Sequence, residues 1–349
     1  MANDDHGELQ ISDQIDGLPQ PFEHGFFQGH SAQEEFFLTQ LNSGRVHHAW
    51  LLSGPKGIGK ATFVFRIARA LLQQNFDAAS NIRDELRGGI DPENRVFRQI
   101  AAGAHPNVLH MRIPYDADKK KFKTQLTVDE IRKTVQFFSS TAGEDGWRIA
   151  IVDSADDLNI SAANALLKVL EEPPARTLFF LLSSHPGRLL PTIRSRCQHL
   201  KFSGLEATDI ADVLTNLEVG ENISSSYIKS HETLLGGSVR RAYLFAAGGN
   251  DEMKASFDEI VVKQSADLQQ IHKFAEVISA RGEDDRYRFF VDFVEDYLST
   301  KLNRTDATHL LVRWAEVWEK VHERLNTADR LNLDRKQTVL GVLHDLNAH

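Results

Sequence analysis

Residues 54 to 61 read Gly-Pro-Lys-Gly-Ile-Gly-Lys-Ala and follow a short apolar run, Ala49 to Ser53. They match the phosphate-binding loop Gly-x-x-x-x-Gly-Lys-Ser/Thr except at the last position, where Ala61 replaces a hydroxyl residue. The glycines let backbone N–H groups close on phosphate oxygens, and Lys60 can reach the terminal phosphates. The missing hydroxyl is the group that normally holds Mg²⁺. The loop therefore predicts an NTPase relative that keeps a phosphate cradle and hydrolyses nucleotide poorly.

The residues after the loop have the spacing of a helix. Apolar side chains recur at Phe63, Ile67, Ala70 and Leu71, so strand, loop and helix follow in the order that the motif needs. Thr62 is a weak substitute for the missing ligand, because a helix turns its side chain elsewhere. The candidate nucleotide-contacting residues of this segment are Gly54, Pro55, Lys56, Gly57, Ile58, Gly59, Lys60, Ala61 and Thr62.

Two further apolar runs have the character of buried strands. They span 148 to 153 and 177 to 184, and both are continuous rather than alternating, as in parallel strands covered on both faces. Helical spacing is found over 128 to 139 and over 162 to 172, where Pro173-Pro174 ends the helix. The sequence thus predicts an α/β fold built on a parallel sheet.

The pattern changes near Phe202, after which only amphipathic helices follow. We expect a loose N-terminal arm over 1–20, the α/β domain over 21–202, a small helical domain over 203–265 and a helical bundle over 266–349. Residues 75 to 100 are polar and charged, and we interpret them as an insertion of low order.

The composition excludes several classes of protein. Of 349 residues, 41% are hydrophobic and 26% charged, and no apolar run approaches the ~20 residues that span a bilayer. The formal charge of −9 argues against a protein that mainly coats nucleic acid. The polar start and the single cysteine, Cys197, predict a cytoplasmic location and exclude a Cys₄ zinc site. The pair His47-His48 and the segment from His105 to His110 lack a metal-binding spacing, so no metal site is expected.

Acidic residues follow the second apolar run. Asp153 stands where phosphate-loop NTPases keep an acid that helps to hold Mg²⁺, but the next residue is Ser154, a poor general base. For Asp156 and Asp157 a surface role is the plainer interpretation. Ser183 and Ser184 end the third run, where a hydroxyl either senses a γ-phosphate or caps the next turn.

Two arginines are further candidates. Arg196, in Arg194-Ser195-Arg196-Cys197, could act as an arginine finger, whose guanidinium contacts a phosphate held by a neighbouring chain. Residue type alone favours a surface salt bridge. Arg240 either folds over a bound nucleotide or lies on a helix surface. Cys197 is interpreted as a buried small apolar residue.

Four motifs occur in an order that is specific. They are Gly-Arg-Val-His-His-Ala-Trp-Leu-Leu-Ser-Gly-Pro-Lys-Gly-Ile-Gly-Lys (44–60), Asn-Ala-Leu-Leu-Lys-Val-Leu-Glu-Glu-Pro-Pro (164–174), Leu-Leu-Pro-Thr-Ile-Arg-Ser-Arg-Cys (189–197) and Gly-Ser-Val-Arg-Arg-Ala (237–242). With them the chain resembles the bacterial DNA polymerase III clamp loaders, an AAA+ family, and most closely the family of delta-prime subunits. The resemblance covers residues from about 20 to 245, and the segment 332–337 resembles the family's collar less specifically.

The resemblance implies a RecA-like AAA+ domain, a helical lid and a collar that joins subunits in a ring. It implies help in opening the sliding clamp and placing it on primed DNA. Its partners would be gamma/tau-type motor subunits and a delta-type subunit, reached through the collar and the Ser-Arg-Cys face, with the clamp and primer-template DNA contacted through the complex. Arg196 would complete the ATP site of an adjacent motor, and Ser184 and Arg240 would match the sensor-1 and sensor-2 positions.

The departures from the family favour a non-motor subunit. Motor subunits carry a hydroxyl after the loop lysine and Asp-Glu at the second strand, where this chain has Ala61 and Ser154. The surviving glycines and Lys60 leave ATP binding open, whereas Mg²⁺ is doubtful. The family's four zinc-binding cysteines are missing, so zinc is not expected.

We therefore expect a chain that is not catalytic alone, with weak or absent ATPase activity, within a DNA-directed DNA polymerase (nucleotidyltransferase) holoenzyme. The alternative is an ATP-hydrolysing motor subunit of the same loader, and an unrelated phosphate-loop kinase or repair NTPase is a more distant one.

Overall fold

The computed structural model describes residues 11–73, 86, 91–117, 121–139, 146–219, 223–247, 251–280, 284–305, 307–331 and 333–347. The chain divides into two compact units. The first unit holds residues 1–221 together with 237–239, and the second holds 222–236 and 240–349. The expected division into an α/β domain, a small helical domain and a bundle stays a prediction.

A five-stranded sheet forms the centre of the first unit, with the order β2-β5-β6-β1-β7 and every neighbouring pair parallel. Its strands are β1 (Ala49–Ser53), β2 (Val108–Met111), β5 (Arg148–Val152), β6 (Thr177–Ser183) and β7 (Gln198–Lys201). A separate antiparallel hairpin joins β3 (Tyr115–Asp116) to β4 (Lys121–Phe122). The parallel pairing brings the carboxyl ends of all five strands to one edge, where the candidate site lies.

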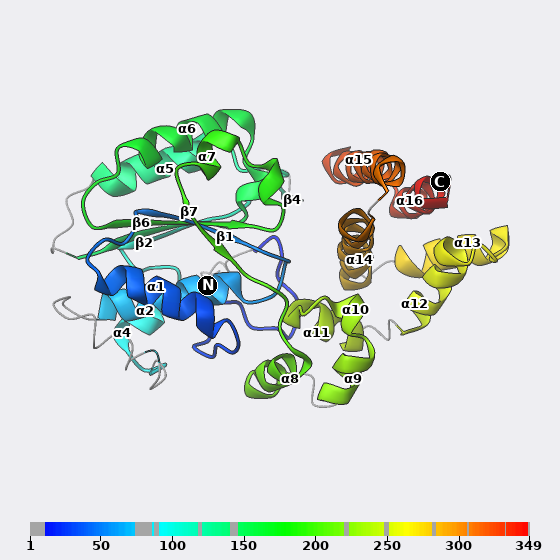
Figure 1. Ribbon diagram of the computed structural model, residues 1–349, viewed down its shortest axis with the longest axis horizontal. Coiled ribbons are helices and arrows are strands. Elements are labelled where there is room, and N and C mark those ends of the chain that lie inside the picture. The colour runs from blue at the N-terminus through cyan, green and yellow to red at the C-terminus, as the bar shows by residue number, and fades with distance from the viewer. Residues whose placement is uncertain are drawn as a thin grey trace, which may run out of the picture. The chain divides into compact units, whose positions relative to one another are not determined.

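Helices cover both faces of the sheet (Figure 1). On one face lie α1 (Ser31–Asn42), α2 (Lys60–Gln73) and α4 (Arg95–Ala101), and on the other lie α5 (Val128–Ser139), α6 (Ile160–Glu171) and α7 (Pro191–Arg194). The unit also contains the short turns η1 (Ala155–Asp157) and η2 (Pro186–Arg188) and the helix α8 (Ala207–Asn216). The predicted α/β fold with a covered parallel sheet is confirmed.

Alternate residues of each strand enter different cores. Trp50 and Leu52 join the core beneath α1 and α2, whereas Leu51 joins the core beneath α5 and α6. The same alternation holds along β6, where Phe180 faces the first core and Phe179 the second. Since both faces are buried, the strands read as continuous apolar runs in the sequence.

Two strands of the five-stranded sheet, and both strands of the hairpin, were not recognised in the sequence analysis. In the sheet these are the edge strands β2 and β7, whose residues are partly buried or exposed apart from Met111 in β2 and Leu200 in β7. Each therefore shows little of the apolar continuity by which the inner strands were recognised. The helix of α5 begins and ends at the predicted residues, 128 and 139.

Of the segment 75 to 100, which we expected to be an insertion of low order, residues 91–100 differ from that expectation. Residues 74–85 and 87–90 lie outside the described residues, but α4 begins after Asn94, whose side chain accepts a hydrogen bond from the N–H of Val96. Phe97 and Ile100 of this helix are buried. Residues 94–101 thus form a capped helix with an apolar face.

The N-terminal arm also differs from the expectation over its described part. Ile11 and Ile15 are buried, and Ile11 belongs to the core beneath α1 and α2. Further along, the fully buried guanidinium of Arg69 donates to the carbonyl oxygens of Phe22 and His24. These contacts fasten the segment before α1 to helix α2, so residues 11–20 belong to the folded unit.

The second unit is helical throughout its described residues. Its helices are α9 (Ser225–Ser230), α10 (Glu232–Leu235), most of α11 (Val239–Ala247), α12 (Asp251–Phe257), the π-helical turn η3 (Asp258–Val262), α13 (Leu268–Ile278), α14 (Asp284–Arg304), α15 (Thr308–Leu331) and α16 (Arg335–Asn347). None of the helices described in either unit has the length and apolar character needed to cross a membrane.

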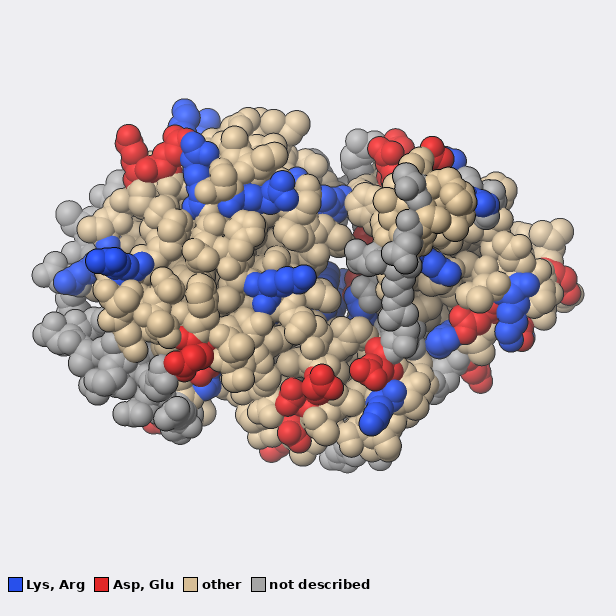
Figure 2. Space-filling view, in the orientation of Figure 1, with Lys and Arg blue, Asp and Glu red and all other residues tan. Residues whose placement is uncertain are grey.

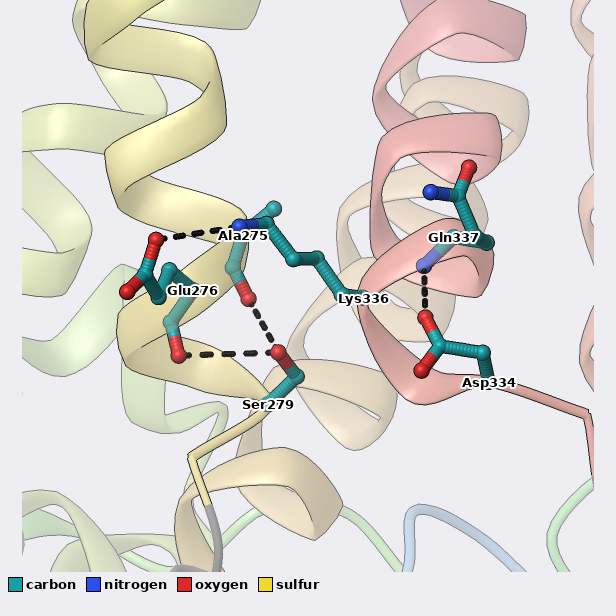
Figure 3. Close-up of polar contacts among 6 residues, drawn as sticks. All are labelled: Ala275, Glu276, Ser279, Asp334, Lys336 and Gln337. Carbon is teal, nitrogen blue, oxygen red and sulfur yellow. Dashed lines mark hydrogen bonds and ion pairs between the residues drawn. The ribbon is translucent and has the colours of Figure 1, made fainter.

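The start of α16 shows how the end of the chain is held in this unit (Figure 3). The side chain of Asp334 accepts a hydrogen bond from the N–H of Gln337 at 2.8 Å, which caps the helix. Lys336 lies two residues after Asp334, and its Nζ is 3.0 Å from Oε2 of Glu276 in α13. The Asp-Arg-Lys-Gln sequence at 334–337 therefore begins one helix and fastens it to another.

Charge is dispersed over the face of the molecule in Figure 2, where basic and acidic side chains of the described residues alternate with uncharged surface. The face drawn in Figure 2 is therefore of mixed charge.

Candidate functional site

The phosphate loop has the backbone that its glycines permit. Gly54, Gly57 and Gly59 have φ angles of 151°, 76° and 100°. A Cβ atom at Gly54 would lie 2.4 Å from the carbonyl oxygen of Phe202. The loop leads from the carboxyl end of β1 into the N-terminus of α2, where backbone N–H groups favour anions. Strand, loop and helix thus occur in the predicted order.

Lys60 is engaged by the loop that it follows. Its Nζ donates to the carbonyl oxygens of Gly54 and Pro55, each at 2.6 Å, and the residue is 8% exposed. A lysine that reached a terminal phosphate would have to give up these two acceptors. The ammonium group therefore stabilises the loop itself in this conformation.

The next loop carbonyls also hold donors from other segments. The carbonyl of Gly57 accepts from the N–H of Val239 at 3.0 Å, and that of Ile58 accepts from Nε2 of His30 at 2.7 Å. Burial lowers the pKa of His30, which keeps the ring neutral. The loop is thus fixed by the segment before α1 on one side and by residues 237–239 on the other.

Asp153 lies at the end of β5, as predicted, and is paired with a histidine. Its Oδ2 lies 3.4 Å from Nε2 of His110, a residue near the carboxyl end of β2. Burial raises the pKa of Asp153, but the hydrogen bond from His110, with the charges of His110, Lys60 and Lys56, outweighs burial and lowers it. Asp153 is therefore an ionised acid that is paired with His110 and lies within the influence of Lys60 and Lys56.

The residues present fit the phosphate groups of a nucleotide but not a Mg²⁺ ion. The glycine loop, the N-terminus of α2 and Lys60 offer the donors that phosphates need. A magnesium ion would meet the methyl group of Ala61, which packs against the core, and a carboxylate already paired with His110. Thr62 lies one residue further along α2, so it is turned by about 100° from the ligand position.

The surface role that we expected for Asp156 is wrong. Its carboxylate accepts hydrogen bonds from Oγ of Ser183 at 2.6 Å, from the N–H of Ser184 at 2.6 Å and from the N–H of His185 at 3.2 Å. This clamp joins the end of β6 to the turn after β5. The hydroxyl of Ser183 is therefore occupied by Asp156, and Ser184, the sensor-1 candidate, is held at the same edge through its backbone.

Asp157 also departs from an ordinary surface acid. Burial and the neighbouring Asp156 raise its pKa to about 6, although Lys56 and Arg188 act in the opposite direction. Asp153, Asp156 and Asp157 thus form a compact acidic group beside the phosphate loop.

Arg196 lies away from these contacts, in the turn between α7 and β7. Its Nη2 lies 2.7 Å from Oε1 of Glu171, and its Nη1 donates to the carbonyl of Thr192 at 3.1 Å. The Arg196 side chain is 37% exposed. The salt bridge is present, and the side chain that makes it is partly exposed to solvent. Burial raises the pKa of the next residue, Cys197, to about 12, and its side chain packs against the core.

Arg240 is described within the second unit. Its Nε lies 3.6 Å from Oδ2 of Asp292 in α14, and both side chains are largely buried. Arg240 follows Val239, whose N–H contacts the phosphate loop, but its guanidinium is paired with α14. The sensor-2 role stays a prediction.

The candidate histidine pairs make backbone contacts. His47 contacts the carbonyl of Ala49 at 2.8 Å, and His48 contacts that of Leu170 at 2.9 Å. Nδ1 of His105 accepts from the N–H of Asn107 at 3.1 Å. Their visible roles are to hold strand and helix ends.

Sequence reasoning missed His30, His110 and Glu171. His110 belongs to an edge strand that was not recognised. Nothing in the sequence around His30, apart from the glycine before it, indicates a role for this residue. Glu171 stands inside a quoted motif, yet nothing in the sequence places it beside Arg196. These three contacts depend on tertiary structure.

A phosphate loop after an inner strand of a five-stranded parallel sheet, followed by helical segments, defines a phosphate-loop protein of the AAA+ class. A family model described as DNA polymerase III, delta subunit, matches residues 29–206, slightly more than half of the chain. The chain belongs to this family of clamp-loader subunits, and the relatives that it matches at 35–39% identity are delta-prime subunits.

Individual relatives agree with this assignment. The chain is 39% identical over 160 residues to the DNA polymerase III subunit delta' of Pseudomonas aeruginosa, covering 46% of this chain and 44% of the relative. It is 35% identical over 188 residues to the Bacillus subtilis delta', covering 53% and 51%. A gamma subunit from Buchnera aphidicola is 29% identical over 201 residues, covering 57% and 50%. The matches thus span about half the length of these curated relatives.

A gamma subunit-related protein of Thermotoga maritima is a structural neighbour, with 15% identity and a TM-score of 0.41 over 89% of this chain and 99% of the other. A score of that size adds nothing to the strand order and the phosphate loop.

Proposed function

We propose that this chain acts as a non-motor, delta-prime-type subunit of a bacterial clamp loader and donates Arg196 in trans to ATP held by a neighbouring subunit. The complex would open a sliding clamp and load it on primer-template DNA. Neighbouring gamma/tau-type and delta-type subunits would be reached through the Ser-Arg-Cys turn and the helices of the second unit.

The observation that carries this proposal is the exposed guanidinium of Arg196. The planar guanidinium presents two terminal nitrogens, which suit phosphate oxygens. Its ion pair with Glu171 is half-exposed, so a more highly charged anion readily displaces the carboxylate. Most other candidate cations of the site point to the protein's own groups. Lys60 contacts its own loop, and Arg240 contacts Asp292.

The same residues argue against the alternative of a motor subunit. ATP would take Lys60 from two carbonyl oxygens, and Ala61 supplies no ligand for Mg²⁺. We therefore propose that any ATP bound here is not turned over, that Mg²⁺ is not held by this loop, and that zinc has no part. The location consistent with a replication subunit is the cytoplasm.

The test is ATP turnover by the complete assembled loader with Arg196→Ala. An arginine finger is worth ~10³ to 10⁵ in rate at the site that it completes, so turnover at the adjoining site should be lost. Arg132→Ala is the matched control, because Arg132 is also an exposed, ion-paired arginine of the first unit.

Arg196→Ala should leave assembly intact, as measured by co-purification of the subunits. Unchanged turnover by the assembled complex would contradict the role of Arg196. Vigorous Mg²⁺-dependent hydrolysis by the isolated chain would instead favour the motor alternative.

A further inference from the structure

The partner of Arg196 within this chain lies at a structurally fixed point. Glu171 is the last residue of α6, and the helix ends there because Pro173-Pro174 follows. The turn before it is anchored, since Leu170 is buried and its carbonyl contacts Nε2 of His48 at 2.9 Å. The carboxylate of Glu171 is therefore presented from a rigid helix end.

The arginine side of the contact is equally constrained. Buried Ile193 in α7 anchors the segment that leads to Arg196, and β7 begins two residues after Arg196. With Nη1 held by the carbonyl of Thr192 and Nη2 by Glu171, both terminal nitrogens of the guanidinium have fixed acceptors. One acceptor lies on the arginine's own turn and the other on a different helix.

We propose that Glu171 is a positioning residue for Arg196, selecting the side-chain conformation in which the guanidinium meets a nucleotide of the neighbouring subunit. This inference rests on the proposed function. The Glu171 and Arg196 side chains are 49% and 37% exposed, and a pair so open to solvent adds little to folding. Its effect is instead to reduce the conformational freedom of a long side chain before the partner arrives.

The exposed geometry also lets the contact be exchanged. A carboxylate carries one negative charge, whereas a triphosphate carries several, so the phosphate outcompetes Glu171 once the subunits meet. Glu171 thus orders the arginine whenever no phosphate faces it, including between turnovers of the assembled loader, and releases it to the phosphate during turnover.

The experiment compares Glu171→Ala with Glu172→Ala in the complete assembled loader. Glu172 is the matched control, because it is the next residue, of the same type and also exposed. We expect Glu171→Ala to lower the kcat for ATP by about 3- to 10-fold, the size of an ordering effect, with the KM for ATP unchanged. Glu172→Ala should change neither, and Glu171→Gln, which keeps an acceptor oxygen, should recover part of the rate.

A double-mutant cycle separates this inference from the proposed function. In the Arg196→Ala background, Glu171→Ala should have no further effect on kcat, because it acts only through Arg196. An equal loss in both backgrounds, or a faster Glu171→Ala loader, would overturn the positioning role. If Arg196→Ala itself left turnover unchanged, the proposed function would fail, whereas an effect of Arg196→Ala with none of Glu171→Ala would overturn only this inference.

Discussion

The phosphate loop and the turn that carries Arg196 belong to one unit but use their polar groups in opposite ways. In the loop, the carbonyls of Gly54, Pro55, Gly57 and Ile58 all accept hydrogen bonds from the protein. The Arg196 side chain instead lies at the surface, 37% exposed, with its guanidinium paired to Glu171. The phosphate loop, which we call the inward region, is a structural joint, since its hydrogen bonds connect separate segments of the unit. The Arg196 turn, the outward region, keeps a group that can act on another chain.

If the proposed function holds, the difference separates two uses of polar groups within one nucleotide-binding fold. The loop carbonyls hold donors of the protein itself, whereas the ion pair of Arg196 is open to solvent. Substitutions in the inward region should therefore affect stability, whereas substitutions in the outward region should affect turnover.

Gly237→Ala should have the largest effect on stability. Gly237 has a φ of 73°, and a Cβ there would lie 2.3 Å from Cα of Gly204 and 2.4 Å from the N of Leu205. Backbone atoms cannot move aside as a flexible side chain can, so we expect a loss of about 3 kcal/mol in the free energy of unfolding. Urea unfolding of the first unit measures it.

Gly187→Ala is the control for this change, because a Cβ at Gly187 meets no atom within 4 Å. If Gly237→Ala were as stable as Gly187→Ala, Gly237 would not be packed tightly against Gly204 and Leu205, and the segment that leads to Val239 at the phosphate loop would not be fixed as described.

Lys60→Met should come next. The substitution keeps the length of the side chain but removes the ammonium group that donates to Gly54 and Pro55. Since hydrogen bonds to a charged group contribute more than neutral ones, we expect a loss of about 2 kcal/mol, read from the same urea transition. The exposed Lys168 of α6, changed to Met, is the matched control, because it lies in the same unit outside the phosphate loop.

A nucleotide-binding assay sharpens this second test. If Lys60→Met abolished ATP binding and left stability unchanged, the lysine would serve a ligand rather than the loop. That result would mean that the phosphate loop, like the Arg196 turn, serves a bound phosphate, which its contacts in this structure do not indicate.

The inner part of the fold was accessible from the sequence. Continuous apolar runs marked β1, β5 and β6, because each is buried on both faces, and the glycine spacing marked the loop between β1 and α2. The edge strand β7 was not recognised, since only Leu200 of its four residues is buried. A strand that buries one side chain has no periodicity to detect.

The candidate site was predictable in its motifs but not in its pairings. Asp153, Ser184 and Arg196 were identified by their place after strands or within a motif. The clamp made by Asp156 and the pairing of Glu171 with Arg196 join elements that are distant in the sequence. Residue type gives no information about such partners, and for this reason Asp156 was interpreted as a surface acid.

Asp157→Asn should give the smallest effect, and one that depends on pH. Burial and the nearby Asp156 raise the pKa of Asp157 to about 6 in the folded chain, from 3.8 for an unperturbed aspartate. The folded state therefore binds the proton more tightly than the unfolded state, and this contribution to stability is present below about pH 4 and lost as the pH rises through about 6. At pH 7 the folded chain carries an unfavourable charge. Asparagine removes it, so the variant should be more stable than the parent by about 1 to 2 kcal/mol after allowance for solvent screening.

The measurement is the free energy of unfolding of the first unit at pH 4 and pH 7, with Asp129→Asn as a control for removing an exposed aspartate of the same unit. A stabilisation that was equal at both pH values, or larger at pH 4, would contradict the raised pKa. The expected pattern would mean that the acidic group beside the phosphate loop retains an electrostatic cost that the inward contacts do not fully offset.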